Sequence, residues 1–122
     1  MEEPEMVKFY QNEENKAIFV SLNGEEACSG AKELIANTTD AAKEKHVPVV
    51  TRKNGVLHIQ VGSALHPMLA EHHIAWIAVE SAGRLVFKYL QPGEEPVVEV
   101  CDSPSGTVYE YCNLHGLWKA DF

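Results

Sequence analysis

The sequence lacks the features that would place it in a membrane, secreted or nucleic-acid-binding class. It contains no run of about 18 apolar residues, and its acidic start (residues 1–5) has no apolar stretch behind it, so neither a membrane span nor a secretory signal is expected. Its 3 cysteines are an odd number without framework spacing, which argues against a disulfide scaffold. With 10 Lys and Arg against 18 Asp and Glu, the net charge is −8 and no basic stripe is available for a phosphate backbone. We therefore expect a cytoplasmic protein with no membrane and no nucleic-acid partner.

The 122 residues suit one domain, or one domain with a small appendage. Residues 1–38 mix charged residues, Asn and Gly with one apolar run, Ala17–Leu22, which leads into the turn signal Asn23-Gly24. From Thr39 onward, short β-like runs alternate with turns that contain Gly or Pro. The change predicts a small N-terminal region over 1–38 and a main domain over 39–122.

The main domain is predicted to be all-β. In the run His73–Glu80, period-two alternation places Ile74 and Trp76 on one face. Ile77 and Val79 then project to the other face. Evenly spaced short runs without a long helical period favour an antiparallel β-sandwich. The other predicted strands of this domain are residues 47–50, 56–61, 84–90, 97–100 and 107–112.

Two pairs of residues have a spacing that suits a metal site. Cys112 and His115 form a C-x-x-H pair, which lets one tight turn present a thiolate and an imidazole to the same ion. His66 and His72 would lie roughly 20 Å apart on a continuous strand. Pro67 interrupts that strand, however, and a loop could then bring both rings to a common point.

A further candidate ligand, His46, is expected at the start of the strand over 47–50. It follows Glu44 and Lys45, and a single helical turn is predicted over 40–45 with Thr38-Thr39 as its caps. Taken alone, a strand-end His is usually a surface or hydrogen-bonded residue, and a lone Cys is often a small buried hydrophobe. Adjacent strand residues face opposite ways, so a ligand at 72 excludes one at 73. The residues predicted to be structural are His58, His73, Cys28 and Cys101.

Four segments resemble the desulfoferrodoxin and neelaredoxin family of superoxide reductases, in the order typical of that family. The resemblance implies an immunoglobulin-like sandwich with one mononuclear Fe(2+)/Fe(3+) per chain, bound by four imidazoles and an axial thiolate. By the same resemblance, Glu44 and Lys45 lie beside an open sixth position, and Glu44 ligates the ferric resting state. His73 departs from the family, which commonly has Tyr there. The segments are DAAKEKHVPV (40–49), HPM (66–68), EHHIAWI (71–77) and YCNLHGLWK (111–119), and the implied ligands are His46, His66, His72, His115 and Cys112.

The N-terminal region resembles the small desulforedoxin-like domain of the family without its metal cysteines. Asn12 and Asn15 stand where relatives have the first two cysteines, and Cys28-Ser29 stands at the second pair. One cysteine cannot hold a rubredoxin-type iron, which needs four thiolates. The resemblance therefore implies a vestigial or purely structural region and a single-iron protein.

The activity implied by the resemblance is the one-electron reduction of superoxide to hydrogen peroxide. Lys45 would attract the superoxide anion, because nearby charges set the local field despite the acidic chain. The implied partners are a rubredoxin-like electron donor and a second copy or copies of the chain, as a homodimer or homotetramer. Residues 117–119 are a candidate docking segment for the donor, although Trp118 is a more natural packing residue.

Three alternatives stay open. The first is a closed zinc or electron-transfer site made by Cys112, His115 and two other His. The second is a non-enzymatic sandwich module that binds a partner. In the third, Glu44 and Lys45 are ordinary surface charges in a charged run.

Overall fold

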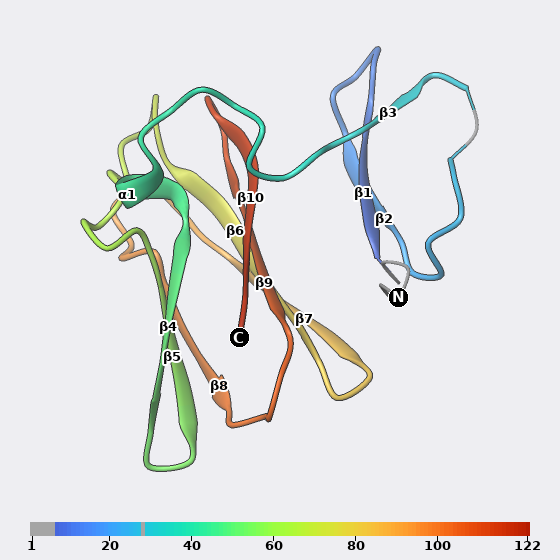
Figure 1. Ribbon diagram of the computed structural model, residues 1–122. Helices are drawn as coiled ribbons and strands as arrows, with labels where there is room; N and C mark the ends of the chain where they lie inside the picture. The colour runs from blue at the N-terminus through green and yellow to red at the C-terminus, as the bar shows by residue number, and fades with distance from the viewer. Residues whose placement is uncertain (1–6, 28) are drawn as a thin grey trace. The chain divides into compact units, whose positions relative to one another are not determined.

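The computed structural model describes residues 7–27 and 29–122 (Figure 1). The chain divides into two compact units, Met1–Ile35 and Ala36–Phe122. The predicted change of texture at residue 38 comes a few residues after this division. Among the described residues, no helix has the length and apolar character needed to cross a membrane. The structural role predicted for Cys28 lies outside the described residues.

The first unit contains a three-stranded antiparallel sheet with the strand order β2-β1-β3. Its strands β1 and β3 are short and show no apolar alternation, so the sequence pattern did not predict them. The Asn12 carboxamide oxygen accepts hydrogen bonds from the backbone N–H groups of Glu14 (2.9 Å) and Asn15 (3.1 Å). The Asn15 carboxamide oxygen accepts from the backbone N–H of Ala17 at 2.9 Å. The side chains of Asn12 and Asn15 therefore close the β1–β2 turn through hydrogen bonds. The strands are β1 (Lys8–Asn12), β2 (Ile18–Ser21) and β3 (Ala31–Glu33).

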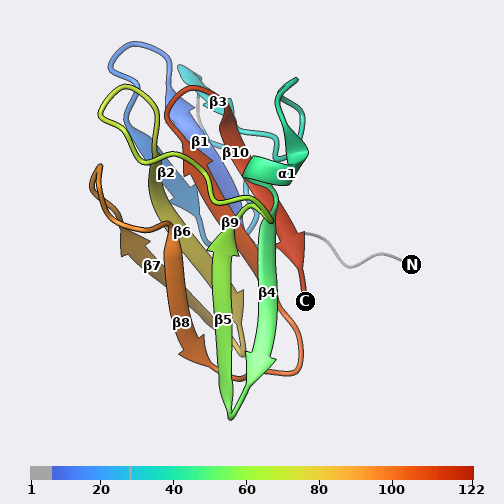
Figure 2. The same cartoon turned by 90° about the vertical axis from the view of Figure 1, so that its left-hand side faces the viewer.

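The second unit is an immunoglobulin-like antiparallel β-sandwich, which confirms the predicted fold class. Figure 2 shows the sheet β4-β5-β8 lying over the sheet β10-β9-β6-β7. The inward side chains of both sheets form the core, as expected for two aligned sheets. The strands are β4 (Pro48–Lys53), β5 (Val56–Val61), β6 (Ile74–Ser81), β7 (Arg84–Tyr89), β8 (Val97–Cys101), β9 (Thr107–Cys112) and β10 (Gly116–Asp121).

The predicted face of Ile74 is wrong because β6 contains a β-bulge. Ile74 pairs with Cys112 whereas Trp76 pairs with the preceding residue of β9, so one extra residue is inserted between them. Ile74 consequently joins Ile77 and Val79 in the buried core. The bulge lies beside Cys112, where it changes the direction of the chain next to the candidate ligands.

Two further local predictions are wrong. His46 does not begin a strand; it is the last residue of the short helix α1 (Lys43–His46). The N-cap of α1 is Ala42, without a side-chain capping hydrogen bond, so Thr38-Thr39 does not cap it.

Strand β10, which was not predicted, pairs with β9 along its whole length. This pairing buries Trp118 to 1% exposure and makes it a packing residue.

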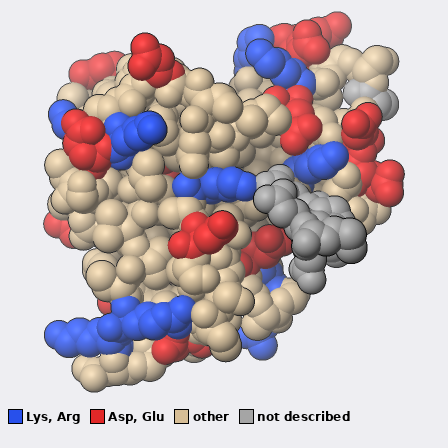
Figure 3. Space-filling model, in the orientation of Figure 1, with Lys and Arg blue, Asp and Glu red and all other residues tan. Residues whose placement is uncertain are grey.

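The surface carries charges of both signs. On the face shown in Figure 3, acidic and basic side chains are interspersed and no extended basic patch forms among the described residues.

Candidate metal centre

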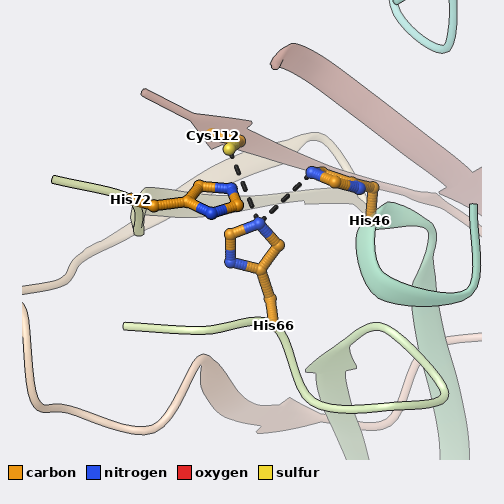
Figure 4. A group of neighbouring side chains, drawn as sticks. All are labelled: His46, His66, His72 and Cys112. Carbon is orange, nitrogen blue, oxygen red and sulfur yellow. Dashed lines mark hydrogen bonds between the residues drawn. The ribbon is translucent and has the colours of Figure 1, made fainter. Parts of the chain in front are cut away.

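Five side chains from separate segments meet at one end of the sandwich. His46 comes from the end of α1, His66 from the loop after β5, His72 from the segment before β6 and Cys112 from the end of β9. One ligand atom from each of these four residues lies within 4.8 Å of all the others (Figure 4). His115, in the turn between β9 and β10, places its Nδ1 3.0 Å from the Nε2 of His46.

The four imidazoles form a closed cycle in the order His46, His66, His72, His115. The ring centroids of neighbours in this cycle are 4.6 to 5.1 Å apart, and neighbouring rings are inclined at 74° to 84°. The rings of His46 and His72, which are not neighbours, are 6.4 Å apart and only 32° from parallel. The four sides of this cycle are similar in length and the diagonal is longer, so the four rings form approximately a square.

Cys112 lies close to two opposite corners of this square. Its Sγ is 3.5 Å from the Nε2 of His66 and 3.9 Å from the Nδ1 of His115. The thiol sulfur therefore lies close to both ends of one diagonal. The candidate donor set is four imidazoles and one thiol.

Backbone carbonyls orient two of the rings. The Nδ1–H of His46 donates to the carbonyl of Ala42 at 2.7 Å, and that of His66 donates to the carbonyl of Pro67 at 2.7 Å. Each bond assigns the proton to Nδ1 and leaves the lone pair of Nε2 directed into the cluster. Trp118 supports two of the histidines, because it stacks on His46 with centroids 4.9 Å apart and donates from Nε1 to the carbonyl of His115 at 3.1 Å.

Burial favours the neutral form of three of the imidazoles, those of His46, His66 and His72. Desolvation lowers the pKa of His66 to about 4 and also lowers the pKa values of His46 and His72. Neutral imidazole is the form that binds a metal ion. Burial raises the pKa of the Cys112 thiol, while backbone N–H groups of Leu114 and His115 oppose that shift. A cation in the cluster would stabilise the thiolate, and its binding would release the thiol proton.

The residues fit a transition-metal ion. The Nε2 of His72 is buried and has no hydrogen-bond partner in the part of the chain that the structure describes, although a buried nitrogen of this kind normally has one. The Nε2 atoms of His46 and His66 are 3.2 Å apart, so two lone pairs face each other unless an ion or a proton lies between them. Imidazole and thiolate donors suit Fe, Cu, Ni or Zn, but structural zinc usually has four tetrahedral ligands. The five candidate donors exceed the four ligands that are usual at a structural zinc site.

Glu44 and Lys45 are exposed on α1 next to the cluster. The charge of Lys45 lowers the pKa values of His46 and His72, whereas the charge of Glu44 raises that of His46. The backbone of α1 is fastened to the loop that carries His66, since the carbonyl of Glu44 accepts from the N–H of Ala64 at 3.0 Å.

Gly62 permits this close fit between α1 and the loop. It has a φ of +86°, and a Cβ there would lie 2.7 Å from the carbonyl oxygen of Lys45 and 2.9 Å from that of Glu44. A side chain at this position would force α1 and the loop apart. The placement of Glu44 and Lys45 therefore depends on a glycine 17 or 18 positions further along the chain.

The other His and Cys residues in the described part of the chain lie outside the cluster. His58 pairs with Glu99 at 3.1 Å on the outer face of the sandwich. His73 precedes β6, so strand parity does not apply to it; its ring instead contacts the carbonyl of Leu69 at 3.0 Å. Cys101 is an exposed free thiol.

The sequence of this chain is similar to the sequences of desulfoferrodoxins. The family model for desulfoferrodoxin matches residues 38–121. A desulfoferrodoxin of Clostridium acetobutylicum is 43% identical over 114 residues, covering 91% of this chain and 91% of that protein.

Solved structures agree with the sequence comparison. The superoxide reductase from Treponema pallidum is 31% identical with a TM-score of 0.74, covering 93% of this chain and 98% of that one. The superoxide reductase (1Fe-SOR) from Giardia intestinalis is 30% identical with a TM-score of 0.56, covering 66% of this chain and 98% of that one.

Proposed function

Because the chain belongs to the desulfoferrodoxin and neelaredoxin family, we propose that it reduces superoxide to hydrogen peroxide at one mononuclear iron. The observation that carries this proposal is the square of four imidazoles with a thiol close to two of its opposite corners. This arrangement leaves the face opposite the thiol without a protein donor from the set. The proposed ligands are His46, His66, His72, His115 and Cys112.

Each turnover adds one electron and two protons to superoxide and yields hydrogen peroxide. Ferrous iron, when bound, would supply the electron. The imidazoles would bind as neutral groups, so with one thiolate the site keeps a net positive charge that favours an anion. The Cys112 thiolate would donate electron density to the bound metal, as a cysteine ligand does in haem oxygen enzymes.

Lys45 is proposed to attract superoxide to the cluster. Its charge already acts on His46 and His72, and its side chain is exposed to the solvent from which the anion arrives. A local positive charge of this kind can raise the association rate even when the net charge of the protein is negative. We further propose that Glu44, on the same turn, ligates the metal in the ferric resting state.

The site needs one electron from outside for every turnover, and we propose a rubredoxin-like protein as the donor. The N-terminal unit is proposed to hold no iron, since Asn12 and Asn15 make turn hydrogen bonds at the cysteine positions. Residues 117 and 118 are buried and do not offer a docking surface. A cytoplasmic location and a homodimer or homotetramer remain predictions.

Metal analysis and rapid mixing test the proposal. We expect the purified protein to contain one iron per chain and, when ferric, a visible thiolate-to-iron charge-transfer band. Mixing the ferrous protein with superoxide should form peroxide without releasing oxygen. A colourless protein with zinc alone would refute the iron site, and release of oxygen would indicate a dismutase instead.

The role of Lys45 has a matched control on the same turn. We expect Lys45→Ala to slow the reaction with superoxide by about tenfold, at the low end for electrostatic steering, with the iron content unchanged. Lys43→Ala removes the same charge from a residue that does not perturb the pKa values of the candidate ligands. Equal rates for the two variants would show that Lys45 has no special role. The Lys45 effect should also weaken with added salt.

A further inference from the structure

We infer that Asn113 is the positioning residue for His72, a role that deepens the proposed metal site and rests on it. Asn113 directly follows Cys112 and occupies the turn between β9 and β10. Its side chain and backbone bind the chain on both sides of His72. Asn113 thereby connects the segment that carries His72 to the end of β9, where Cys112 lies.

Three hydrogen bonds carry this inference. The Asn113 side-chain oxygen accepts from the backbone N–H of His73 at 2.8 Å, and its Nδ2 donates to the carbonyl of Glu71 at 3.1 Å. The backbone N–H of Asn113 also donates to the carbonyl of His73 at 3.1 Å. The residues before and after His72 are therefore both held by one asparagine.

His72 needs such support more than the buried rings of His46 and His66 do. His46 and His66 each donate from Nδ1 to a backbone carbonyl, which fixes the plane of the ring. In the described part of the chain, no carbonyl accepts a hydrogen bond from the His72 ring, and its Nε2 is buried without a partner. The direction of the ring is then set by the backbone that carries it.

The turn that contains His72 is closed by local hydrogen bonds. Leu69 and His72 exchange backbone hydrogen bonds of 2.8 and 3.1 Å. The pairing of β6 with β9 begins at Ile74, opposite Cys112, and Asn113 extends the attachment to the residues on both sides of His72. A side chain in this role acts as the second layer of a metal site, where the loss of an orienting partner typically costs about 10- to 100-fold in metal affinity or activity.

The chain supplies a matched control in Asn37. Its side chain also makes one accepting and one donating bond to a single segment, to the N–H of Lys119 at 2.9 Å and to the carbonyl of the same residue at 3.2 Å. The φ of Asn37 is 62°, so Asn37→Ala places Ala in the left-handed region in addition to removing the two hydrogen bonds. It should therefore lower the stability of the fold at least as much as Asn113→Ala does. The hydrogen bonds of Asn37 within the described residues go to Leu117 and Lys119 and not to a candidate ligand.

The experiment measures iron release and the visible spectrum of the full-length iron-loaded protein. Asn113→Ala should speed iron release to a chelator by about 10- to 100-fold and shift the thiolate-to-iron band. Asn113→Asp retains an acceptor for His73 N–H and loses the donor to Glu71, so it should fall between the wild type and Asn113→Ala. Asn37→Ala should release iron at the wild-type rate.

Two results would overturn the inference. One is iron release and a spectrum for Asn113→Ala that match the wild type. The other is a change of the same size in Asn37→Ala, which would show that general destabilisation is the cause. A wild-type protein that binds no iron would refute the proposed function itself, a result that is distinguishable because it appears before any variant is compared.

Discussion

Replacing Glu110 by Gln should stabilise the metal-free protein at neutral pH. Glu110 lies on β9 between Val108 and Cys112, and its residue is fully buried at 0% exposure. Neither carboxylate oxygen has a hydrogen-bond partner among the described residues. Burial raises the pKa of this carboxyl group to about 9, from an ordinary value of 4.5. The folded protein must therefore keep a proton that the unfolded chain releases.

The sign and size of the effect follow from this difference. Because the folded pKa is the higher one, Glu110 destabilises the fold increasingly as the pH rises from about 4.5 toward about 9. At pH 7 the cost is on the order of 3 kcal/mol, and it grows by about 1.4 kcal/mol per pH unit. Gln has nearly the same shape as the protonated acid and does not ionise, so the two proteins should be equally stable below pH 4.5.

Denaturant unfolding of both proteins between pH 5 and 8 measures this difference. The buried histidines are common to both proteins, and their contribution cancels. Metal-free protein is required, because a cation bound at Cys112 would favour the carboxylate two positions away. A stability difference that does not change with pH would refute the reasoning, and so would a less stable Glu110→Gln protein at pH 7.

Two other predictions concern the site and the turn that supports it. Gly62→Ala should cost at least about 2 kcal/mol and weaken iron binding, since Ala has a positive φ there and its Cβ meets backbone carbonyls. Gly55→Ala is the control in denaturant unfolding, because Gly55 also has a positive φ but has open space around it, and equal losses would contradict the close contact. The iron-loaded protein should retain its metal at pH 6 and lose it as the pH falls toward about 4, because burial holds the pKa of His66 at about 4 and the ring resists protonation above that pH. Metal analysis after dialysis checks this, and loss of iron already at pH 6 would contradict it.

Local patterns were sufficient for much of the fold. Alternating apolar residues separated by turn residues predicted the strands from β4 to β9, because each strand buries one face. They did not predict the bulge in β6 that turns Ile74 into the core, since a bulge depends on pairing with β9. They also missed β10, whose short apolar run depends on that same strand for its hydrogen bonds.

The type and order of the candidate ligands were readable in the sequence. Cys112 and His115 share one turn, so their proximity is a local property. Their approach to His46 and His66 is not local, because it requires two sheets and the loops at one end of the sandwich.

Only the tertiary structure decided which residues support the ligands and in what environment. Two of these features are contacts between segments that are distant in sequence: Trp118 stacks on His46, and Asn113 bonds on both sides of His72. A third, the burial of Glu110, also depends on residues that are distant in sequence. No spacing rule encodes such contacts. The sequence thus determined the chemistry of the donors through residue type, whereas the packing of the two sheets determined their geometry, their pKa shifts and their supporting hydrogen bonds, because these depend on distances through space.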